Sequence, residues 1–397
     1  MSSYKYSVYN SAKRSSSRNS NRSGGNKRRG EYINPARFIA VAKPTQAADY
    51  APKHLFEDFA VDPIIHRNLT AKGFIVPSPI QDQTIPIALE GRDIIGIANT
   101  GTGKTAAFAV PVIQSLINNR DAKALIVAPT RELAQQIEGE CRSIGKGGGF
   151  TGALLIGGTG MGTQLRDLRA RPRIIIGTPG RIKDHIERGT LKLDSCNLVV
   201  LDEVDRMLDM GFLPDVSFIL KQLSPNRQSF FFSATMDPRV QGLIGTFSNN
   251  PETVSVKSGE SSDHVNQNVV RYVGIGDKMD KLHDILIKDE VSKAIVFDET
   301  QRSVERLSNE LIARGFAADA IHGGKSQGQR ERALNSFKTN KTKILVATDV
   351  AARGIDVVDI THVINYSQPQ SYQDYVHRIG RAGRAGRVGH ALTFVNQ

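Results

Sequence analysis

Tryptophan is absent from this chain of 397 residues, and only two cysteines, Cys141 and Cys196, are present. Neither cysteine has a Cys or His neighbour at the spacing of metal ligands, which argues against a disulfide framework or a zinc site and favours reduced thiols. The sequence has no run of about 18 apolar residues, and its N-terminus is polar and serine-rich, so we expect neither a membrane span nor a secretion signal. These absences predict a cytoplasmic protein without membrane contact.

Acidic residues are scarce at the N-terminus. The chain has a formal charge of +12, and residues 1–37 hold nine Lys or Arg against one Glu, which leaves only about +4 on the rest. Residues 15–30 are rich in Ser, Asn, Gly and Arg, so we expect residues 1–50 to form a disordered basic arm. Such arms usually bind nucleic acid through its phosphates, and a solubilising or targeting tail is the alternative.

Short apolar runs alternate with helical stretches along the rest of the chain. Because these runs are apolar on both faces, they predict strands of parallel sheets covered by helices. The expected strands are residues 93–97, 124–128, 173–176, 198–201, 229–232, 294–297, 318–321, 344–347, 362–366 and 391–395. Residues 249–268 have few large apolar side chains and are typical of a connection between domains. The sequence therefore predicts two α/β domains, residues 51–254 and 268–397, joined by a flexible linker at 255–267.

A glycine-rich stretch, ANTGTGKT at residues 98–105, follows the first expected strand. Its glycines let the backbone curl around a triphosphate, so that amide groups, a helix N-terminus and the Lys104 ammonium face anionic oxygen, while Thr105 offers a hydroxyl to Mg²⁺. Ala98 departs from the GxxxxGK[ST] template, but a strand before the loop and a helix after it support a phosphate site. The alternative is a glycine-rich turn with a solvated lysine. The predicted ATP contacts of this loop are Thr100, Gly101, Thr102, Gly103, Lys104 and Thr105.

Two carboxylates follow the expected strand 198–201, in the sequence DEVD. The strand delivers them to the carboxyl edge of the sheet, where α/β proteins place ligands. Asp202 is suited to hold Mg²⁺ through water, and Glu203 to polarise the water that attacks the γ-phosphate. The alternative is a solvated acidic helix start.

Phe74 and Gln81 precede the glycine-rich stretch by about twenty residues. The Gln81 side-chain amide can hydrogen-bond N6 and N7 of adenine, so Gln81 would select ATP, and Phe74 could stack on the ring. Taken alone, they are an ordinary core Phe and a surface Gln.

The second half carries HRIGRAGR at residues 377–384. Several arginines so close together repel one another unless an anion lies opposite, and we expect Arg381 and Arg384 to reach the γ-phosphate across a cleft between the domains. A surface basic patch is the alternative. Because the first half has no substitute for these arginines, hydrolysis should be negligible until the domains close.

Together, these motifs resemble those of the DEAD-box RNA helicases, over roughly residues 56–397 and in the order of the family. The resemblance implies two RecA-like domains, ATP and Mg²⁺ as cofactors, and RNA as partner. It implies that Asp356 binds the ribose, that His377 links the catalytic water to Ser233 and Thr235, and that these two couple hydrolysis to strand handling. The RNA contacts that it implies are Thr130, Arg131, Gly158, Thr178, Gly180, Arg181, Gln329, Arg332, Thr348 and Arg353.

The chain departs from the family in three places. Val204 replaces the alanine of the family's name, which should tighten packing without altering charge. Asp298 and Glu299 stand where the family usually has an apolar–Asn pair, and two carboxylates are unfavourable near phosphate. The family usually adds a helix after the last strand, which predicts a shortened second domain here.

These features predict an ATP-dependent RNA helicase that unwinds short duplexes locally by domain closure, with RNA-stimulated hydrolysis, as a monomer. The contacts go to the backbone of single-stranded or short duplex RNA, so no target sequence can be read, and no protein partner can be named. One alternative is an RNA chaperone whose basic arm does the work while ATP only switches affinity. A DNA helicase of a related superfamily is disfavoured by the Gln81 segment together with HRIGRAGR.

Overall fold

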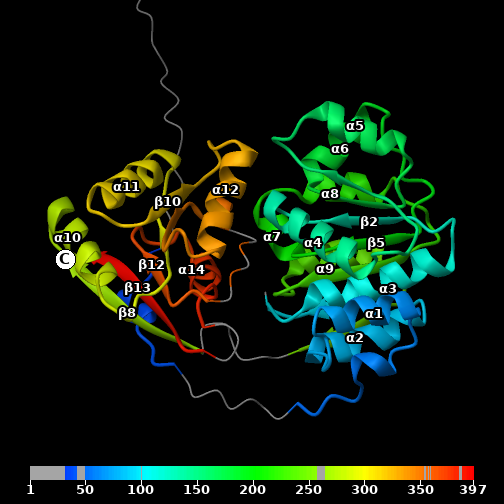
Figure 1. Ribbon diagram of the computed structural model, residues 1–397, viewed down its shortest axis with the longest axis horizontal. Helices are drawn as coiled ribbons and strands as arrows, with labels where there is room; N and C mark the ends of the chain where they lie inside the picture. The colour runs from blue at the N-terminus through cyan, green and yellow to red at the C-terminus, as the bar shows by residue number, and fades with distance from the viewer. Residues whose placement is uncertain are drawn as a thin grey trace, which may run out of the picture.

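The computed structural model describes residues 32–42, 50–99, 101–256, 264–352, 355, 357, 359–383 and 387–397. Its two α/β domains lie side by side in Figure 1. Elements before and in the first domain are the 3-10 helices η1 (Pro35–Phe38) and η2 (Phe56–Asp58), α1 (Pro63–Ala71), α2 (Pro79–Leu89), β1 (Ile94–Ile97), α3 (Lys104–Asn118), β2 (Ala124–Val127), α4 (Arg131–Ile144), β3 (Gly152–Leu155), α5 (Met161–Arg169), β4 (Ile174–Gly177), α6 (Pro179–Glu187), β5 (Leu198–Leu201), α7 (Val204–Asp209), α8 (Leu213–Leu220), β6 (Gln228–Ser233), α9 (Pro238–Phe247) and β7 (Glu252–Ser255). Those of the second are β8 (Val265–Tyr272), α10 (Gly274–Leu286), β9 (Ala294–Phe297), α11 (Gln301–Ala313), β10 (Ala318–Ile321), α12 (Gln327–Lys338), β11 (Ile344–Ala347), α13 (Asp349–Ala352), β12 (His362–Asn365), α14 (Tyr372–Ile379) and β13 (Gly389–Asn396).

Both sheets are parallel. The first has the strand order β3-β4-β2-β5-β6-β1-β7, and the second β10-β11-β9-β12-β13-β8. The pairing of β1 with β6 and that of β2 with β5 illustrate the parallel register. Two parallel sheets flanked by helices confirm the fold class predicted from the sequence.

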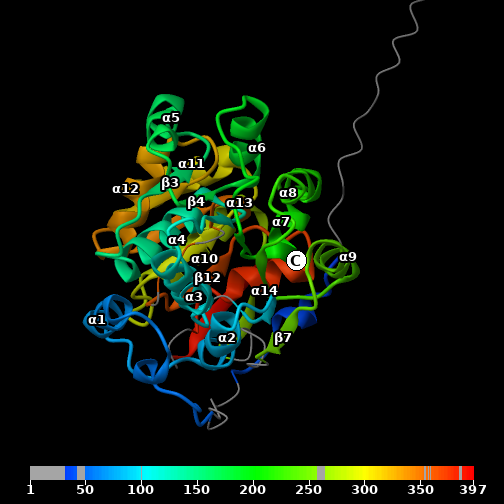
Figure 2. The same cartoon turned by 90° about the vertical axis from the view of Figure 1, so that its right-hand side faces the viewer.

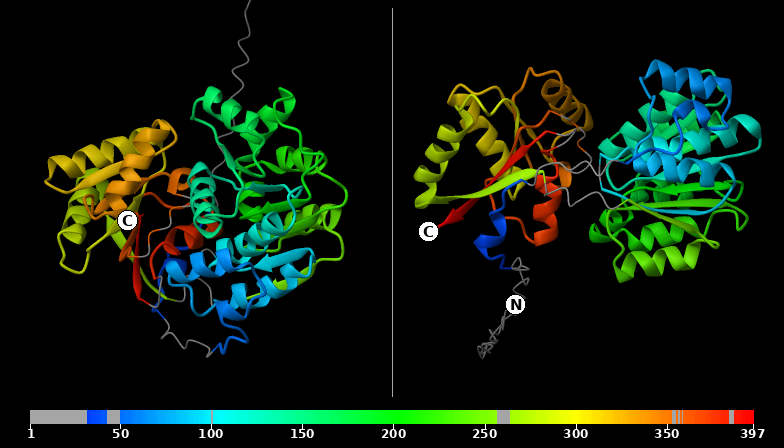
Figure 3. Two further views of the ribbon diagram at one scale, coloured as in Figure 1. Left: turned by 45° about the vertical axis from the view of Figure 1, so that its right-hand side comes forward. Right: turned by 90° about the horizontal axis from the view of Figure 1, so that it is seen from below.

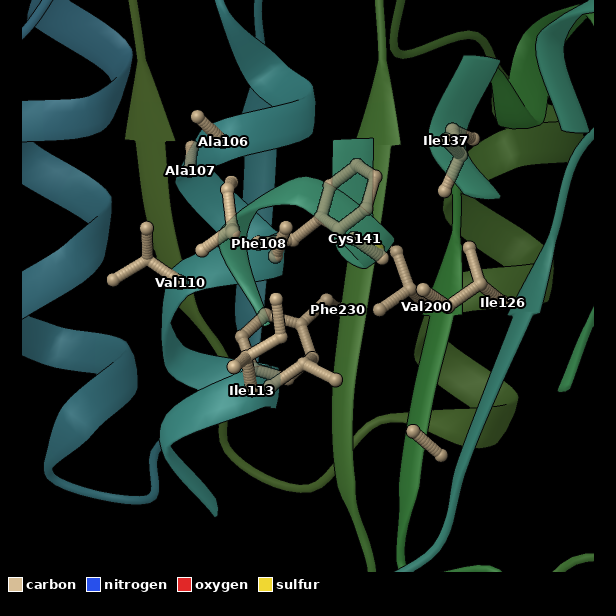
Figure 4. Close-up of a cluster of buried hydrophobic side chains, with 14 of the residues drawn as sticks. Ala106, Ala107, Phe108, Val110, Ile113, Ile126, Ile137, Cys141, Val200 and Phe230 are labelled. Atoms are coloured by element: carbon tan, nitrogen blue, oxygen red, sulfur yellow. The ribbon is translucent and has the colours of Figure 1, made fainter. Parts of the chain in front are cut away.

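The first sheet is buried on both faces because its central strands present apolar side chains to both sides. On one face, Phe108 of α3 packs against the sheet among Ile126, Val200 and Phe230 (Figure 4). On the other face, the neighbouring residues Val199 and Phe231 pack under α6, α7, α8 and α9. Because these strands are covered on both faces, their sequences are continuously apolar. This pattern is why they could be predicted from the sequence.

In Figure 2, α5 and α6 lie at one end of the first domain, and α1 and α2 lie at the other end. In the second domain, α12, α13 and α14 contribute to one buried cluster and α10 and α11 to the other. In Figure 1, α12 lies on the side of the second domain that faces α4 and α7 of the first. No helix in the described part of the chain has the length and apolarity needed to cross a bilayer.

Three strands were missed by the sequence analysis, namely β3, β7 and β8. Each is the last strand at one edge of its sheet. Edge strands are covered on fewer sides, so their sequences keep polar or small residues and lack a continuous apolar run. For this reason the stretch 249–268, expected to be mainly a connection, instead contains β7 and the start of β8; residues 257–263 lie outside the described part.

The structure also contradicts part of the prediction that the N-terminal basic arm is disordered. Residues 1–50 were predicted to be disordered, but residues 33–42 pack against the second domain, where Phe38 is fully buried. Ala40 forms an antiparallel bridge with Gln267 of β8. Buried apolar side chains and backbone hydrogen bonds together hold this segment, and composition does not reveal them. Residues 1–31 and 43–49 lie outside the described part.

Gly96 of β1 tests the tight packing behind the glycine-rich loop. A Cβ added there would overlap the ring of Phe232 on the neighbouring strand. We expect Gly96→Ala to lower the free energy of unfolding by about 1–3 kcal/mol, measured by urea denaturation. Gly139→Ala is the control: Gly139 is exposed on α4 with open space at its Cβ, so this change should stabilise by about 0.5–1 kcal/mol. A Gly96→Ala protein as stable as the parent would contradict the packing described here.

Candidate active site

The glycine-rich loop joins the end of β1 to the start of α3, where Lys104 is the first helical residue. Gly101 and Gly103 have φ angles of +84° and +91°, in the left-handed region that favours glycine. A Cβ on Gly103 would also collide with the Gln81 side chain and lie 3.0 Å from Ser78 Oγ. The loop therefore needs glycine at 103 both for its turn and for close approach of α2. Thr100 lies outside the described residues.

Polar side chains of α2 and α3 hold this loop through its carbonyl oxygens. Lys104 Nζ donates to the Ala98 carbonyl at 3.0 Å, and Gln81 Nε2 donates to the Gly103 carbonyl at 3.1 Å. Ser78 Oγ donates to the Thr102 carbonyl at 2.7 Å. Sequence reasoning placed Lys104 and Gln81 at the nucleotide, and the structure puts both at the loop, in buried positions.

Two adjacent carboxylates lie opposite the loop. Asp202 and Glu203 follow β5 and are 2% and 4% exposed, so their charges are removed from bulk water. Burial raises the pKa of Asp202 and outweighs the nearby Lys104 ammonium, which lowers it. Burial also acts on Glu203, but Arg206, Lys104 and Arg381 hold the pKa of Glu203 below its usual value. The two carboxylates thus differ: the pKa of Asp202 is raised to about 6, and that of Glu203 is lowered.

The backbone and the charge partner of Glu203 are both unusual. Its φ of +54° is left-handed, which costs energy for a residue with a Cβ, and such strain is concentrated at functional sites. Arg206 Nη1 lies 3.3 Å from Glu203 Oε2, and both side chains are buried. Neither of these two atoms makes a hydrogen bond within the described part of the chain. Sequence reasoning missed Arg206; its spacing of three residues from Glu203 on a helix start was the available signal.

The loop and the carboxylates line one cavity of about 280 Å³, which we call the phosphate cavity. Its walls come from both domains, because Ile355 and Arg381 of the second domain lie in it together with residues of the first. The predicted residues that line it are Phe74, Gln81, Gly101, Gly103, Lys104, Thr105, Asp202, Glu203 and Arg381. Three other predicted residues at this site, Thr100, Asp356 and Arg384, lie outside the described part.

Arg381 follows α14 and is 4% exposed. Its Nη1 donates to the Ile355 carbonyl at 2.9 Å, and its charge is close enough to Glu203 to lower the pKa of that carboxyl. Arg378, one turn earlier, instead binds Asp349 with two hydrogen bonds of 2.5 and 2.7 Å. The two arginines therefore differ in role: Arg378 ties α14 to α13, while Arg381 lies in the phosphate cavity. His377 is half-buried beside Asp349, Asp374 and Arg381, and is not among the residues that line the phosphate cavity.

The last carboxylate of DEVD links the cavity to the end of β6. Asp205 Oδ2 accepts hydrogen bonds from the backbone amides of Ala234 and Thr235, at 3.1 and 3.0 Å, and from Thr235 Oγ1 at 3.1 Å. The Asp205 amide in turn donates to Ser233 Oγ at 3.3 Å. Ser233 and Thr235, predicted to couple hydrolysis to strand handling, are therefore bonded directly to the carboxylate segment.

A second cavity of about 440 Å³, the arginine groove, lies along the other part of the domain boundary. Its lining includes the predicted RNA contacts Thr130, Arg131, Thr178, Gly180 and Arg181, together with Gly323 and Arg330 of the second domain. Burial, and then repulsion by Arg330 and Arg181, lower the pKa of Arg131. Arg330 is paired with Glu132, which also lines the groove, so Arg131 and Arg181 are the cations suited to bind an anion such as a phosphate backbone.

Gly158 takes part in this groove through Arg131. Its φ is +78°, and a Cβ at this position would overlap the Arg131 guanidinium. The guanidinium thus lies against bare backbone, which fixes its direction. Thr348 is 9% exposed and its amide donates to the Ile321 carbonyl at 3.4 Å. Arg353, also predicted to contact RNA, lies outside the described residues.

Two other predicted RNA contacts, Gln329 and Arg332 of α12, are not brought to the groove. Both are exposed: the Gln329 side chain accepts from the Ser326 amide and caps the helix, and Arg332 Nε donates to the Gly328 carbonyl. The same Gln-x-x-Arg spacing occurs two residues earlier, at Gln327 and Arg330, and these two side chains are buried. The spacing fits two frames, and only the earlier one, Gln327 and Arg330, faces the first domain.

Gln327 and Arg330 join the two domains. Arg330 Nη2 lies 2.6 Å from Glu132 Oε1, and both side chains are less than 10% exposed. Gln327 Nε2 donates to Gln135 Oε1 at 3.0 Å, and Gln135 Nε2 donates to Glu331 Oε1 at 2.5 Å. This interdomain cluster packs α12 against α4.

The acidic departure at residues 298 and 299 has a local structural explanation. Asp298 is 8% exposed, and its carboxylate accepts from the Glu299 amide at 2.8 Å. Its charge also opposes the fall in the pKa of Lys278 that burial causes. Lys278 Nζ lies 4.0 Å from the ring centre of Tyr366. Neither carboxylate lines the arginine groove.

A magnesium ion fits the oxygen atoms of the phosphate cavity. No group of three or more His, Cys, Asp or Glu side chains that could hold a metal by themselves occurs in the described residues. Asp202 and the Thr105 hydroxyl share the cavity, and burial leaves the Asp202 carboxylate in need of a cation. Mg²⁺ bound with a nucleotide usually has few protein oxygens as ligands, and water and phosphate complete its coordination shell.

Comparisons with known proteins agree with this arrangement. A family model for the DEAD/DEAH box helicases matches residues 78–243, and one for the conserved helicase C-terminal domain matches residues 277–386. A solved structure of Mss116p bound to single-stranded RNA and AMP-PNP superposes with a TM-score of 0.77 at 31% identity, covering 90% of this chain and 77% of that one.

Two bacterial relatives extend the comparison. The ATP-dependent RNA helicase CshA of Limosilactobacillus reuteri is 44% identical over 322 residues, which are 80% of this chain and 65% of the relative. The DEAD-box ATP-dependent RNA helicase CshA of Geobacillus kaustophilus is 44% identical over 341 residues, or 86% of this chain and 73% of the relative. The chain spans about two thirds of the length of the L. reuteri relative. With 44% identity over most of this chain, and the two helicase domains in order, the protein belongs to the DEAD-box helicase family.

Proposed function

We propose that this protein is an ATP-dependent RNA helicase that binds RNA without sequence specificity and unwinds short duplexes locally through ATP-driven domain closure. The observation that carries the proposal is the phosphate cavity, in which Lys104 and Glu203 of the first domain share one space with Arg381 of the second. A site divided in this way works only when the domains are together. The L. reuteri and G. kaustophilus relatives named as RNA helicases, and Mss116p with RNA and a nucleotide, support the substrates.

Several residues of the phosphate cavity have a task in hydrolysis. Lys104 and the amides at the start of α3 hold the phosphates, while Phe74 and Gln81 lie where the base is expected. Glu203, ionised and buried, accepts a proton from the attacking water. Arg381 stabilises the negative charge that develops on the γ-phosphate, a contribution of about 10³- to 10⁵-fold in other nucleotide hydrolases. Thr105 and Asp202 would hold Mg²⁺, which would neutralise part of the phosphate charge.

RNA is expected in the arginine groove. Arg131 and Arg181, with the exposed backbone at Gly180, suit the sugar-phosphate chain and leave the bases unread. Because the groove also contains Arg330, an RNA strand lying in it contacts both domains at once. RNA thereby favours the closed arrangement in which Arg381 reaches the phosphate cavity.

An RNA chaperone whose basic arm does the work is not favoured, because a cavity built from both domains is more than an affinity switch requires. We further propose that the protein acts as a monomer in the cytoplasm. Both the phosphate cavity and the arginine groove are built from one chain, so neither site needs a second copy, and the relatives compared are bacterial RNA helicases.

The experiment that tests the proposed activity measures ATP hydrolysis with RNA, with DNA of identical sequence, and with neither. RNA should stimulate strongly, and DNA less, because the 2′-hydroxyls distinguish the two strands. An RNA-independent rate equal to the stimulated rate would rule out closure as the source of activity. Equal stimulation by DNA would instead point to the related DNA helicases.

Glu203→Gln is expected to keep ATP and RNA binding and to lower turnover by roughly 10²- to 10⁴-fold, since the amide cannot accept the proton. Equilibrium binding of labelled ATP and RNA and a single-turnover hydrolysis assay check both parts. Glu138→Gln, a change of an α4 carboxylate outside both cavities, is the matched control and should hydrolyse normally. Persistent hydrolysis by Glu203→Gln would remove Glu203 from the assigned role.

Arg330→Gln and Arg332→Gln distinguish the two frames of the Gln-x-x-Arg spacing. Losing the pair with Glu132 should reduce RNA-stimulated turnover roughly tenfold, because interdomain charge pairs of this kind couple by about 1.5 kcal/mol or more. Arg332 is exposed on the same helix, and its replacement should change turnover less than twofold. The opposite ranking, measured at saturating RNA, would favour the frame first predicted from the sequence.

A further inference from the structure

The segment of residues 33–42 is the first described part of the chain, yet it packs on the domain furthest from it in sequence. Figure 3 shows this segment, in dark blue, beside the yellow and red elements of the second domain. Ile33 is 5% exposed and Phe38 0% exposed, and both belong to the buried cluster beneath α14. We call residues 33–42 the docked segment.

The docked segment holds α14 through aromatic contacts. The ring centre of Phe38 lies 4.7 Å from that of Tyr375, a fully buried residue of the helix. The Arg37 guanidinium lies 3.7 Å from the ring centre of Tyr372, one turn earlier on the same helix. Two neighbouring residues of the segment thus contact two successive turns of α14.

The same segment is bonded to the edge strand of the second sheet. The Ala40 amide donates to the Gln267 carbonyl at 3.1 Å, and the Gln267 amide donates back at 2.7 Å. The Ala42 amide donates to Asn266 Oδ1 at 2.8 Å. Tyr375 Oη donates to Gln267 Oε1 at 2.9 Å, so the segment, the strand and the helix form one closed set of contacts.

These contacts are relevant to ATP hydrolysis because α14 carries Arg378 and leads to Arg381. Asp349 fixes Arg378 on the helix. Arg381 follows the end of α14 and lines the phosphate cavity. The loop after Arg381 also packs on the start of β8, since a Cβ on Gly383 would lie 2.8 Å from the His264 carbonyl oxygen. The helix and the loop that set the direction of Arg381 therefore rest on the two elements that the docked segment joins.

We propose that the docked segment is a positioning element for Arg381, with Phe38 as its anchor. It fixes α14 against β8, and so fixes the approach of the Arg381 guanidinium to the phosphate cavity. The inference rests on the proposed function, because it assigns the segment a part in ATP hydrolysis. It also gives residues 33–42 a task separate from that of the basic residues before them.

Phe38→Ala tests the proposal, with Ile39→Ala as the matched control because Ile39 is 55% exposed in the same segment. At saturating RNA, Phe38→Ala should lower kcat for ATP roughly tenfold, a part of the about 10³- to 10⁵-fold that a cross-domain arginine contributes. KM for ATP should change less than twofold, because most residues expected to bind ATP are in the first domain, and Asp356, the exception, does not lie in the docked segment or in α14. Ile39→Ala should match the parent protein in both constants.

A second variant separates positioning from folding. Phe38→Leu keeps an apolar side chain in the pocket but loses the ring contact with Tyr375, so its kcat should lie between those of Phe38→Ala and the parent. Far-UV spectra and urea midpoints establish that each variant is folded at the assay temperature. A kcat equal to that of the parent in both Phe38 variants overturns the inference, as does an equal loss in Ile39→Ala.

Truncation distinguishes the docked segment from the preceding basic residues. A chain lacking residues 1–31 should keep its kcat at saturating RNA, and one lacking residues 1–42 should lose it to the extent that Phe38→Ala does. Adding a synthetic peptide of residues 32–42 to the shorter chain should restore part of the rate. If the parent protein shows no RNA-stimulated hydrolysis, the proposed function fails; if it does and both truncations match it, the positioning inference alone fails.

Discussion

Glu203 and Arg381 come from different domains, and Arg381 contributes to holding the pKa of Glu203 below its usual value. Both side chains are nearly excluded from water, at 4% exposure each. A buried carboxylate is costly unless cations lie close to it, and here Arg206, Lys104 and Arg381 supply them. The second domain therefore contributes, through Arg381, to the electrostatic environment of Glu203, beside Arg206 and Lys104 of the first domain. The site depends on the two domains staying in this arrangement.

Two ion pairs and the path of the backbone help to keep Arg381 and the two domains in this arrangement. The bidentate pair of Arg378 with Asp349 fixes the helix before Arg381, and the pair of Arg330 with Glu132 holds α12 on α4. The backbone crosses between the domains twice, once between residues 42 and 50 and once between residues 256 and 264, because the docked segment lies on the second domain. Two crossings restrict the relative motion of the domains more than one linker does.

Much of this arrangement could be predicted from the sequence, because it depends on local patterns. The loop around Lys104 needs glycines, and the carboxylates must follow a buried strand, so both leave clear signals. Edge strands such as β8 were missed because their polar sequences resemble connections. The contact of Arg330 with Glu132 depends on which face of α12 meets the other domain, and a repeated spacing cannot decide that. Phe38 was hidden for a related reason, since one buried ring in a polar, basic stretch becomes visible only when its pocket is known.

The central claim is that one phosphate cavity is completed from two domains that RNA brings together. Its most direct test is the dissociation constant of a non-hydrolysable ATP analogue, measured with and without saturating single-stranded RNA, together with the reverse experiment. The account predicts that RNA tightens analogue binding, by a factor within the usual range of about 5 to 150, and that the analogue tightens RNA binding by the same factor. Dissociation constants that do not change when the other ligand is added would contradict the account.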